Sequence, residues 1–138
     1  MVQQELAGFE ELDHTADWSL RVWAPDLAGL LEQAARGMQS LCAVRITEGQ
    51  RQSKDLRVEA NDAEGLLVNF LGEVLHLAEQ EHLAFDKFEL SVSDSMLNAR
   101  LEGGLIVEQT KEIKAVTYHN LTVDKVTAGL EARIVFDV

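Results

Sequence analysis

The segment from Asp62 to Glu81 constrains the fold more than any other part of the sequence. Its apolar residues recur at helical spacing, which predicts a helix capped by Asn61 or Asp62. The apolar face is wide, so this helix should be deeply packed inside the domain. The residues that form the face are Leu66, Leu67, Phe70, Leu71, Val74, Leu75 and Ala78.

A second helix and several strands are expected around it. Pro25-Asp26 is a start signal, and an apolar stripe after it predicts a helix over residues 26–42. Alternating apolar and polar residues predict strands at 17–23, around 56–58, at 88–92 and at 97–101, and a final pair at 114–123 and 130–137. We therefore expect one α+β domain over residues 1–138, with antiparallel or mixed sheets packed on two α-helices.

Composition is typical of a single globular domain and indicates the cellular compartment of the protein. The chain has 138 residues, of which 46% are hydrophobic and 26% charged, so disorder is not expected. No apolar run approaches the roughly 18 residues that cross a bilayer, and no signal peptide is visible. The single cysteine, Cys42, excludes an internal disulfide and is expected to be a small buried hydrophobe. These features predict a cytoplasmic protein.

Net charge restricts the partners. The sequence has 12 basic and 24 acidic residues, a formal net charge of −12. Nucleic acids are bound through many lysine and arginine contacts to phosphates, so a free-standing RNA or DNA binder is disfavoured. An acidic body instead suits cations or a basic protein surface, although solubility alone also accounts for such a charge.

Oxygen-rich clusters stand at both ends of the chain. In an extended segment Asp13, Thr15 and Asp17 share one face, and Asp137 ends an apolar strand beside the terminal carboxylate of Val138. Carboxylates and carbonyls are the ligands of hard divalent cations. Hydrogen-bonded surface carboxylates are nevertheless commoner, so the residues alone leave both interpretations open.

The remaining polar residues predict little further chemistry. We expect His14 to fix a local turn and His119 to take a packing position in a strand. Lys114 is either a solvated strand end or a cation facing phosphate or the acidic cluster. No phosphate loop, nucleophile elbow or zinc spacing is present, and Gly103-Gly104 is only a turn or bulge signal. Holding a metal is the chemistry that these residues offer.

Three segments in order resemble the archease family. They are residues 11–17 (Glu-Leu-Asp-His-Thr-Ala-Asp), 112–119 (Glu-Ile-Lys-Ala-Val-Thr-Tyr-His) and 132–138 (Ala-Arg-Ile-Val-Phe-Asp-Val). The resemblance covers nearly the whole chain. Two departures stand out: Trp18-Ser19 replaces the Ile-Gly that commonly follows the first motif, and the stretch 104–111 is short.

The resemblance implies an accessory protein rather than an enzyme. Archeases are partners of the RtcB-type RNA-splicing ligase, which joins RNA ends bearing a 2′,3′-cyclic phosphate or 3′-phosphate to a 5′-hydroxyl in tRNA splicing and processing. That ligase uses GTP and divalent metal to form a covalent guanylate on a histidine. The archease promotes this guanylylation and multiple turnover, and it meets RNA only through the ligase, with no role for a membrane.

The resemblance also assigns residues. It carries metal ligation to Asp17 and Asp137, with Val138 contributing through its backbone or terminal carboxylate and Asp13 beside them. Lys114 is the lysine of the same site, with a role in ligase activation. The expected cation is Ca²⁺, Mg²⁺ or Mn²⁺. Two other classes remain as alternatives: a metal-dependent phosphohydrolase, and a general chaperone or assembly module.

Overall fold

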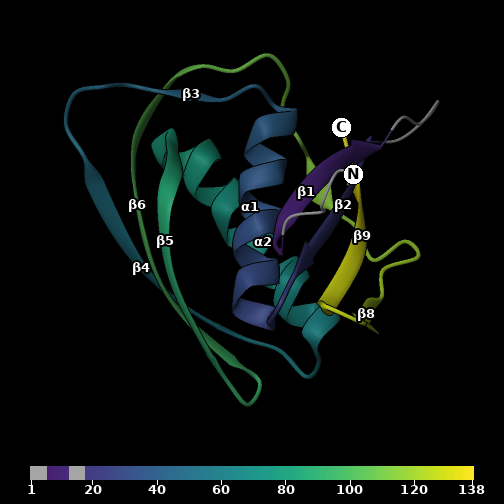
Figure 1. Ribbon diagram of the computed structural model, residues 1–138. Helices are drawn as coiled ribbons and strands as arrows, with labels where there is room; N and C mark the ends of the chain where they lie inside the picture. The colour runs from purple at the N-terminus through teal and green to yellow at the C-terminus, as the bar shows by residue number, and fades with distance from the viewer. Residues whose placement is uncertain (1–5, 13–17) are drawn as a thin grey trace.

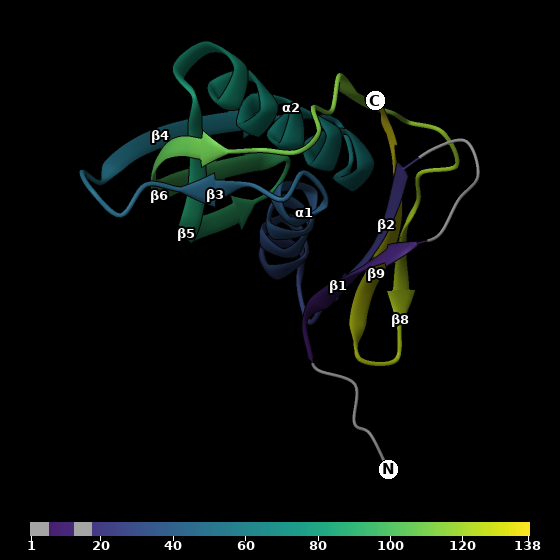
Figure 2. The same ribbon diagram turned by 90° about the horizontal axis from the view of Figure 1, so that it is seen from above.

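A computed structural model describes residues 6–12 and 18–138, which form two antiparallel sheets with two helices between them (Figures 1 and 2). We call one the terminal sheet; its order is β1 (Gly8–Leu12), β2 (Trp18–Ala24), β9 (Gly129–Asp137) and β7 (Ala115–Val116), with β8 (Val123–Val126) also pairing with β9. The central sheet has the order β3 (Arg45–Ile46), β6 (Met96–Glu108) and β4 (Gln52–Glu59), with β5 (Leu83–Ser93) also pairing with β6. The expected α+β class is confirmed.

Both predicted helices are present, and each begins at an aspartate. Helix α1 (Leu27–Leu41) follows Asp26, whose Oδ1 accepts a hydrogen bond from the backbone N–H of Gly29 at 2.8 Å. Helix α2 (Ala63–Glu81) follows Asp62, whose Oδ1 accepts one from Gly65 at 2.7 Å. These bonds satisfy N–H groups that have no partner within the helix. Asp62, rather than Asn61, is therefore the cap of α2.

The core lies between the sheets. Helix α1 contacts β2 and β9 of the terminal sheet and β5 of the central sheet, while α2 contacts β4, β5 and β7. Most of the predicted apolar face of α2 is buried, whereas Leu75 and Ala78 are half-buried. One cluster of buried side chains joins both helices and both sheets. Each sheet thus turns one face to the core and leaves an outer face toward solvent. No helix in the described part of the chain is long and apolar enough to cross a membrane.

Strands β5 and β6 form a long hairpin around the predicted turn, and they contain the predicted bulge. The register of this pair shifts between Phe85 and Lys87, opposite Gly103. A Cβ atom at Gly103 would overlap the carbonyl oxygen of Ala84. The absence of a side chain at Gly103 therefore lets the two backbones approach at the bulge.

The prediction for residues 114–129 was wrong in detail. Only Ala115–Val116 pair as a strand in the first half, because the chain turns where the N–H of Leu121 donates to the carbonyl of Tyr118 at 3.1 Å. Asn120 adopts a left-handed conformation there, with φ of 52°, which an extended strand does not allow. Residues 124–126 lie between the two expected strands, where a turn was predicted, but they form β8 together with Val123. The sequence did carry a signal for this break: apolar and polar residues alternate from Val116 to His119, and the alternation fails at Asn120, a residue type that tolerates the left-handed conformation.

Candidate functional site at the end of the terminal sheet

Three strands meet where the chain ends. Trp18, the first residue of β2, pairs with Phe136 of β9, and Ala115 of β7 pairs with Asp137. The backbone N–H of Lys114 donates to the carbonyl oxygen of Asp137 at 2.7 Å. The start of β2, which follows the first motif in the sequence, thus lies with parts of the second and third motifs at one end of the terminal sheet, where Figure 2 shows the C-terminus beside the start of β2.

Alternation along β9 places Asp137 on the outer face of the sheet. Ala132, Ile134 and Phe136 are buried against the helices, while Arg133 and Asp137 are exposed, as the sequence predicts. Val138 follows as a half-buried residue that packs against the core. The carboxylate of Asp137 is therefore accessible, while the backbone that carries it is fixed by pairing with β7.

Only part of the predicted metal-binding set can be located. Asp13, His14 and Asp17 lie outside the described residues, so the structure describes only Asp137 and Val138 of this set. Within residues 6–12 and 18–138, no group of three or more His, Cys, Asp or Glu side chains is arranged to hold a metal ion. The metal site stays a prediction.

Two lysines flank the end of the sheet. Lys114 directly precedes β7, and its side chain is exposed. The Nζ atom of Lys111 lies 5.5 Å from the ring centroid of Trp18, a cation–π contact. Sequence reasoning missed Lys111, although its position three residues before Lys114 was a signal. Both cations stand beside the acidic chain end, where they can meet an anionic partner.

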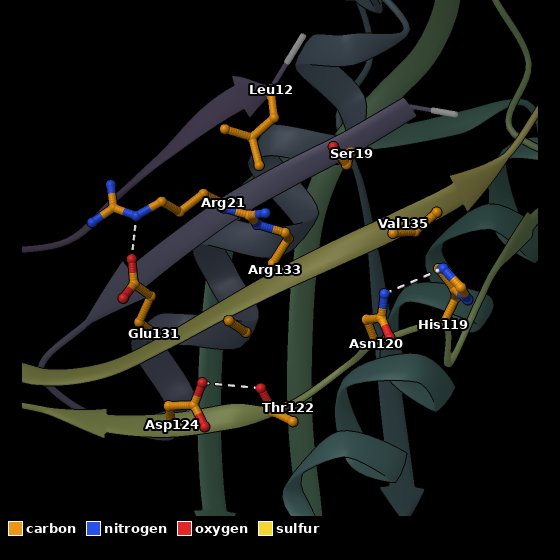
Figure 3. Close-up of a pocket in the computed structure, with 11 residues that line it drawn as sticks. Leu12, Ser19, Arg21, His119, Asn120, Thr122, Asp124, Glu131, Arg133 and Val135 are labelled. Carbon is orange, nitrogen blue, oxygen red and sulfur yellow. Dashed lines mark hydrogen bonds and ion pairs between the residues drawn. The ribbon is translucent and has the colours of Figure 1, made fainter. Parts of the chain in front are cut away.

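A pocket of about 670 Å³ lies farther along the same outer face (Figure 3). Strands β2 and β9 contribute Arg21 and Arg133, and the loop before β8 contributes His119 and Asn120; further lining residues are Leu12, Ser19, Thr122, Asp124, Glu131, Ala132 and Val135. The predicted packing role of His119 was wrong, because the turn at Asn120 exposes its ring at this pocket. Sequence reasoning placed Arg133 on the face of Asp137 but assigned it no role.

Cys42 has no place in a reactive site. Its side chain is 4% exposed, as expected for a small buried hydrophobe. Burial raises the pKa of the thiol to about 11. The thiolate, which is the reactive form, is therefore scarce at neutral pH, and the residue acts in packing.

Comparison with known proteins assigns the chain. The model of the archease protein family (MTH1598/TM1083) matches residues 9–138. The chain belongs to the archease family. Curated archeases that resemble it include those of Methanosarcina barkeri (29% identical, covering 94% of this chain and 95% of the relative) and Thermococcus gammatolerans (31%, covering 88% and 91%).

Solved structures agree with this archease fold. The solution structure of Methanobacterium thermoautotrophicum protein 1598 matches with a TM-score of 0.73 and 26% identity, over 95% of this chain and 99% of that one. A Thermotoga maritima crystal structure, described as an archease and possible chaperone, has a TM-score of 0.69 over 94% and 96%. Its identity is 20%, so it supports the fold alone.

One archease departure noted in the sequence lies next to the candidate site. Trp18 and Ser19 open β2; Trp18 lies beneath Lys111, and Ser19 is buried at the border of the pocket. The larger Trp18 ring thus adds an aromatic surface that a lysine covers. The departure therefore changes the surroundings of the site and leaves Asp137 and Lys114 in place.

Proposed function

We propose that this archease is a non-catalytic, metal-binding accessory protein that activates an RtcB-type RNA ligase. In this role it promotes guanylylation and multiple turnover of the ligase during tRNA splicing. Family membership supports the proposal, and the observation that carries it is the meeting of Trp18, Lys114 and Asp137 at one sheet end. These three segments are far apart in the sequence, and a shared functional site requires that the fold place them side by side.

The proposed metal ligands are Asp17, Asp137 and Val138, with Asp13 beside them. The described donors suit a hard cation such as Ca²⁺, Mg²⁺ or Mn²⁺, because Asp137 offers an exposed carboxylate and Val138 offers backbone or terminal oxygens. Asp17 directly precedes Trp18 in the sequence, and Trp18 pairs with the residue before Asp137. When bound, the cation would supply positive charge that offsets phosphate charge at the ligase nucleotide site.

Lys114 takes the role of a phosphate contact in this proposal. Its backbone is held by the hydrogen bond to Asp137, while its exposed side chain is free to reach outward. A lysine ammonium is a compact charge suited to a phosphate or to the guanylylated state. The position of Lys114 is thus coupled to that of Asp137.

Charge favours a protein partner over RNA itself. The net charge of −12 repels a phosphate backbone on average, and it attracts a basic cleft built to hold RNA. We therefore expect tRNA to be met through the ligase.

A multiple-turnover ligation assay with cyclic-phosphate RNA tests the proposal. Asp137→Asn and Lys114→Ala should each abolish activation of the purified ligase, because each removes one charge from the site while the domain stays folded. Circular dichroism and thermal unfolding check that fold. Asp94→Asn is the matched control for Asp137, since Asp94 is an exposed carboxylate in the β5–β6 turn, where its φ of 56° is tolerated by asparagine.

The other function classes give different outcomes in the same assay. Full activation by Asp137→Asn and by Asp17→Asn would contradict the proposal and favour a general chaperone, which does not depend on these carboxylates. Release of phosphate from substrate by the isolated protein would instead favour a phosphohydrolase. Direct measurement of cation binding by the wild type and by Asp137→Asn separates loss of metal from loss of ligase contact.

A further inference from the structure

The pocket on the outer face contains two arginines in direct opposition. Arg21 of β2 and Arg133 of β9 are cross-strand partners, and alternation puts both side chains on the same outer face (Figure 3). Like charges directly opposite each other on a sheet are destabilising. Figure 3 shows the guanidinium of Arg21 turned away from Arg133 toward Glu131, which lowers this repulsion and leaves Arg133 without that carboxylate as a counter-charge.

Among the described residues, only one of the two arginines has a carboxylate partner. Arg21 forms an ion pair with Glu131, and its guanidinium lies 4.5 Å from the ring centroid of Trp23. Arg133 is exposed and makes no hydrogen bond, ion pair or cation–π contact within the part of the chain that the structure describes. In a chain with twice as many acidic as basic residues, an arginine without a carboxylate partner is unexpected.

The carboxylates of the pocket are already engaged. Glu131 accepts from Arg21, and Asp124 accepts a hydrogen bond from the hydroxyl of Thr122 at 2.9 Å, along the border shown at the bottom of Figure 3. The opposite side offers donors: the guanidinium of Arg133, and the side-chain amide of Asn120 beside the His119 ring at 3.3 Å. The pocket therefore presents N–H donors on the side of Arg133 and Asn120, whereas the carboxylate of Asp124 keeps its negative charge at another border of the pocket.

We propose that this pocket binds a phosphate group, either of a free nucleotide or of RNA that the ligase holds, with Arg133 as its main ligand. A guanidinium matches phosphate oxygens with two parallel N–H bonds, and a tetrahedral anion can accept a further donor from the pocket wall, such as the side-chain amide of Asn120. This site goes beyond the proposed function: Arg133 and Asp137 stand four residues apart on β9, about 13 Å along the strand.

A titration of the full chain with inorganic phosphate, followed by ¹H–¹⁵N NMR at constant ionic strength, tests the site. Wild-type protein should show saturable shifts at Arg21, Asn120 and Arg133. Arg133→Gln should weaken binding about tenfold or more, because charge-assisted hydrogen bonds are lost. Arg45→Gln makes the same charge change on the central sheet, where Arg45 pairs with Glu108, and should bind as the wild type does.

Thermal unfolding guards against a misfolded variant. Arg133 is exposed and makes no ion pair among the described residues, so the melting temperature of Arg133→Gln should stay close to that of the wild type. Phosphate should raise the melting temperature of the wild type and of Arg45→Gln but not that of Arg133→Gln. Shifts that stay linear with phosphate concentration, or an equal loss of binding in Arg45→Gln, would overturn the proposal.

Two further probes distinguish the source of the phosphate. Tighter binding of guanosine 5′-monophosphate than of inorganic phosphate, with the same dependence on Arg133, indicates a free nucleotide. Tighter binding of a short single-stranded RNA without terminal phosphates indicates a nucleic-acid backbone. Neither measurement involves the ligase or a metal, so this site and the proposed activation can fail independently.

Discussion

The outer faces of the two sheets treat their charges in opposite ways. On the central sheet each arginine has a carboxylate partner: Arg45 pairs with Glu108, Arg51 with Asp86 and Glu102, Arg57 with Glu59, and Arg100 with Asp55. On the described terminal sheet Arg21 pairs with Glu131, whereas Arg133 has no partner. Exposed pairs stabilise a fold little, so their main consequence is neutrality. The arginines of the central sheet are thus neutralised, whereas, among the described residues, Arg133 of the terminal sheet keeps its charge available for a ligand.

This contrast predicts that substitutions on the outer face of the terminal sheet change ligand binding. In the central sheet, by comparison, the substitutions that matter are those that disturb backbone packing, and they change stability. The largest effect is expected from Gly103→Ala. The added Cβ overlaps the carbonyl oxygen of Ala84, and backbone cannot move aside as a flexible side chain does. Chemical denaturation should show a loss of about 3 kcal/mol in the free energy of unfolding.

Gly72→Ala is the matched control for Gly103→Ala. Gly72 is exposed on α2, and a Cβ there meets nothing within 4 Å. Because alanine favours a helix over glycine, this variant should be about 1 kcal/mol more stable. A Gly103→Ala protein as stable as the wild type would show that the bulge adjusts and that the central sheet is less rigid than its register indicates.

How much of the fold could be predicted from the sequence differs from element to element. Elements whose pattern and end signals agree were found: α1 and α2 have both an apolar stripe and a capping aspartate, and the β5–β6 hairpin has a clear turn. Strands β1 and β3 were missed, because Gly8–Leu12 and Arg45–Ile46 are short and carry no regular alternation. The break at Asn120 was missed because residues 114–123 were interpreted as one strand, although the alternation fails at this asparagine, which adopts a left-handed conformation.

The sequence predicted the residues at the end of the terminal sheet but not the pocket that contains Arg21 and Arg133. The motifs indicated that Lys114 and Asp137 belong together, and the hydrogen bond between their backbones confirms that proximity. The pairing of Arg21 with Arg133 depends on the register of β2 against β9, 112 residues apart in the sequence. Composition and spacing contain no information on that register, so the phosphate pocket appears only in the folded chain. Asp13 and Asp17 lie outside the described residues, and their role stays a prediction.

A smaller effect is expected from Glu131→Gln, which removes the carboxylate partner of Arg21 on the terminal sheet. Removing this carboxylate frees Arg21 and adds one positive charge to the pocket, so phosphate affinity should rise roughly fivefold, or about 1 kcal/mol. The half-exposed pair itself contributes less than about 1 kcal/mol to stability. The phosphate titration measures the change, and Glu108→Gln, which frees Arg45 on the central sheet, should leave affinity unaltered. Weaker binding in Glu131→Gln would mean that Glu131 positions Arg21 for the anion.

The smallest effect expected is a change in the pH dependence of stability, caused by the ion pair between Arg51 and Asp86 on the central sheet. The hydrogen bonds from Arg51 hold the pKa of Asp86 below its ordinary value. A carboxylate with a lowered folded-state pKa stabilises the fold above its unfolded pKa of about 3.9, and this contribution is lost as pH falls through the folded value. Arg51→Gln should therefore raise the pKa of Asp86, measured by NMR, and bring acid unfolding to a slightly higher pH.

Arg45→Gln separates the local pair from the general field. It removes the same charge from the same sheet but leaves the contact between Arg51 and Asp86 intact, so the pKa of Asp86 should stay low. An equal rise of that pKa in both variants would show that the overall charge of −12, rather than pairing, sets the titration of this sheet. Local ion pairs would then not neutralise the arginines of the central sheet, because their charges would act mainly at long range, where salt screens them. The two sheets would not differ in how their arginines are neutralised.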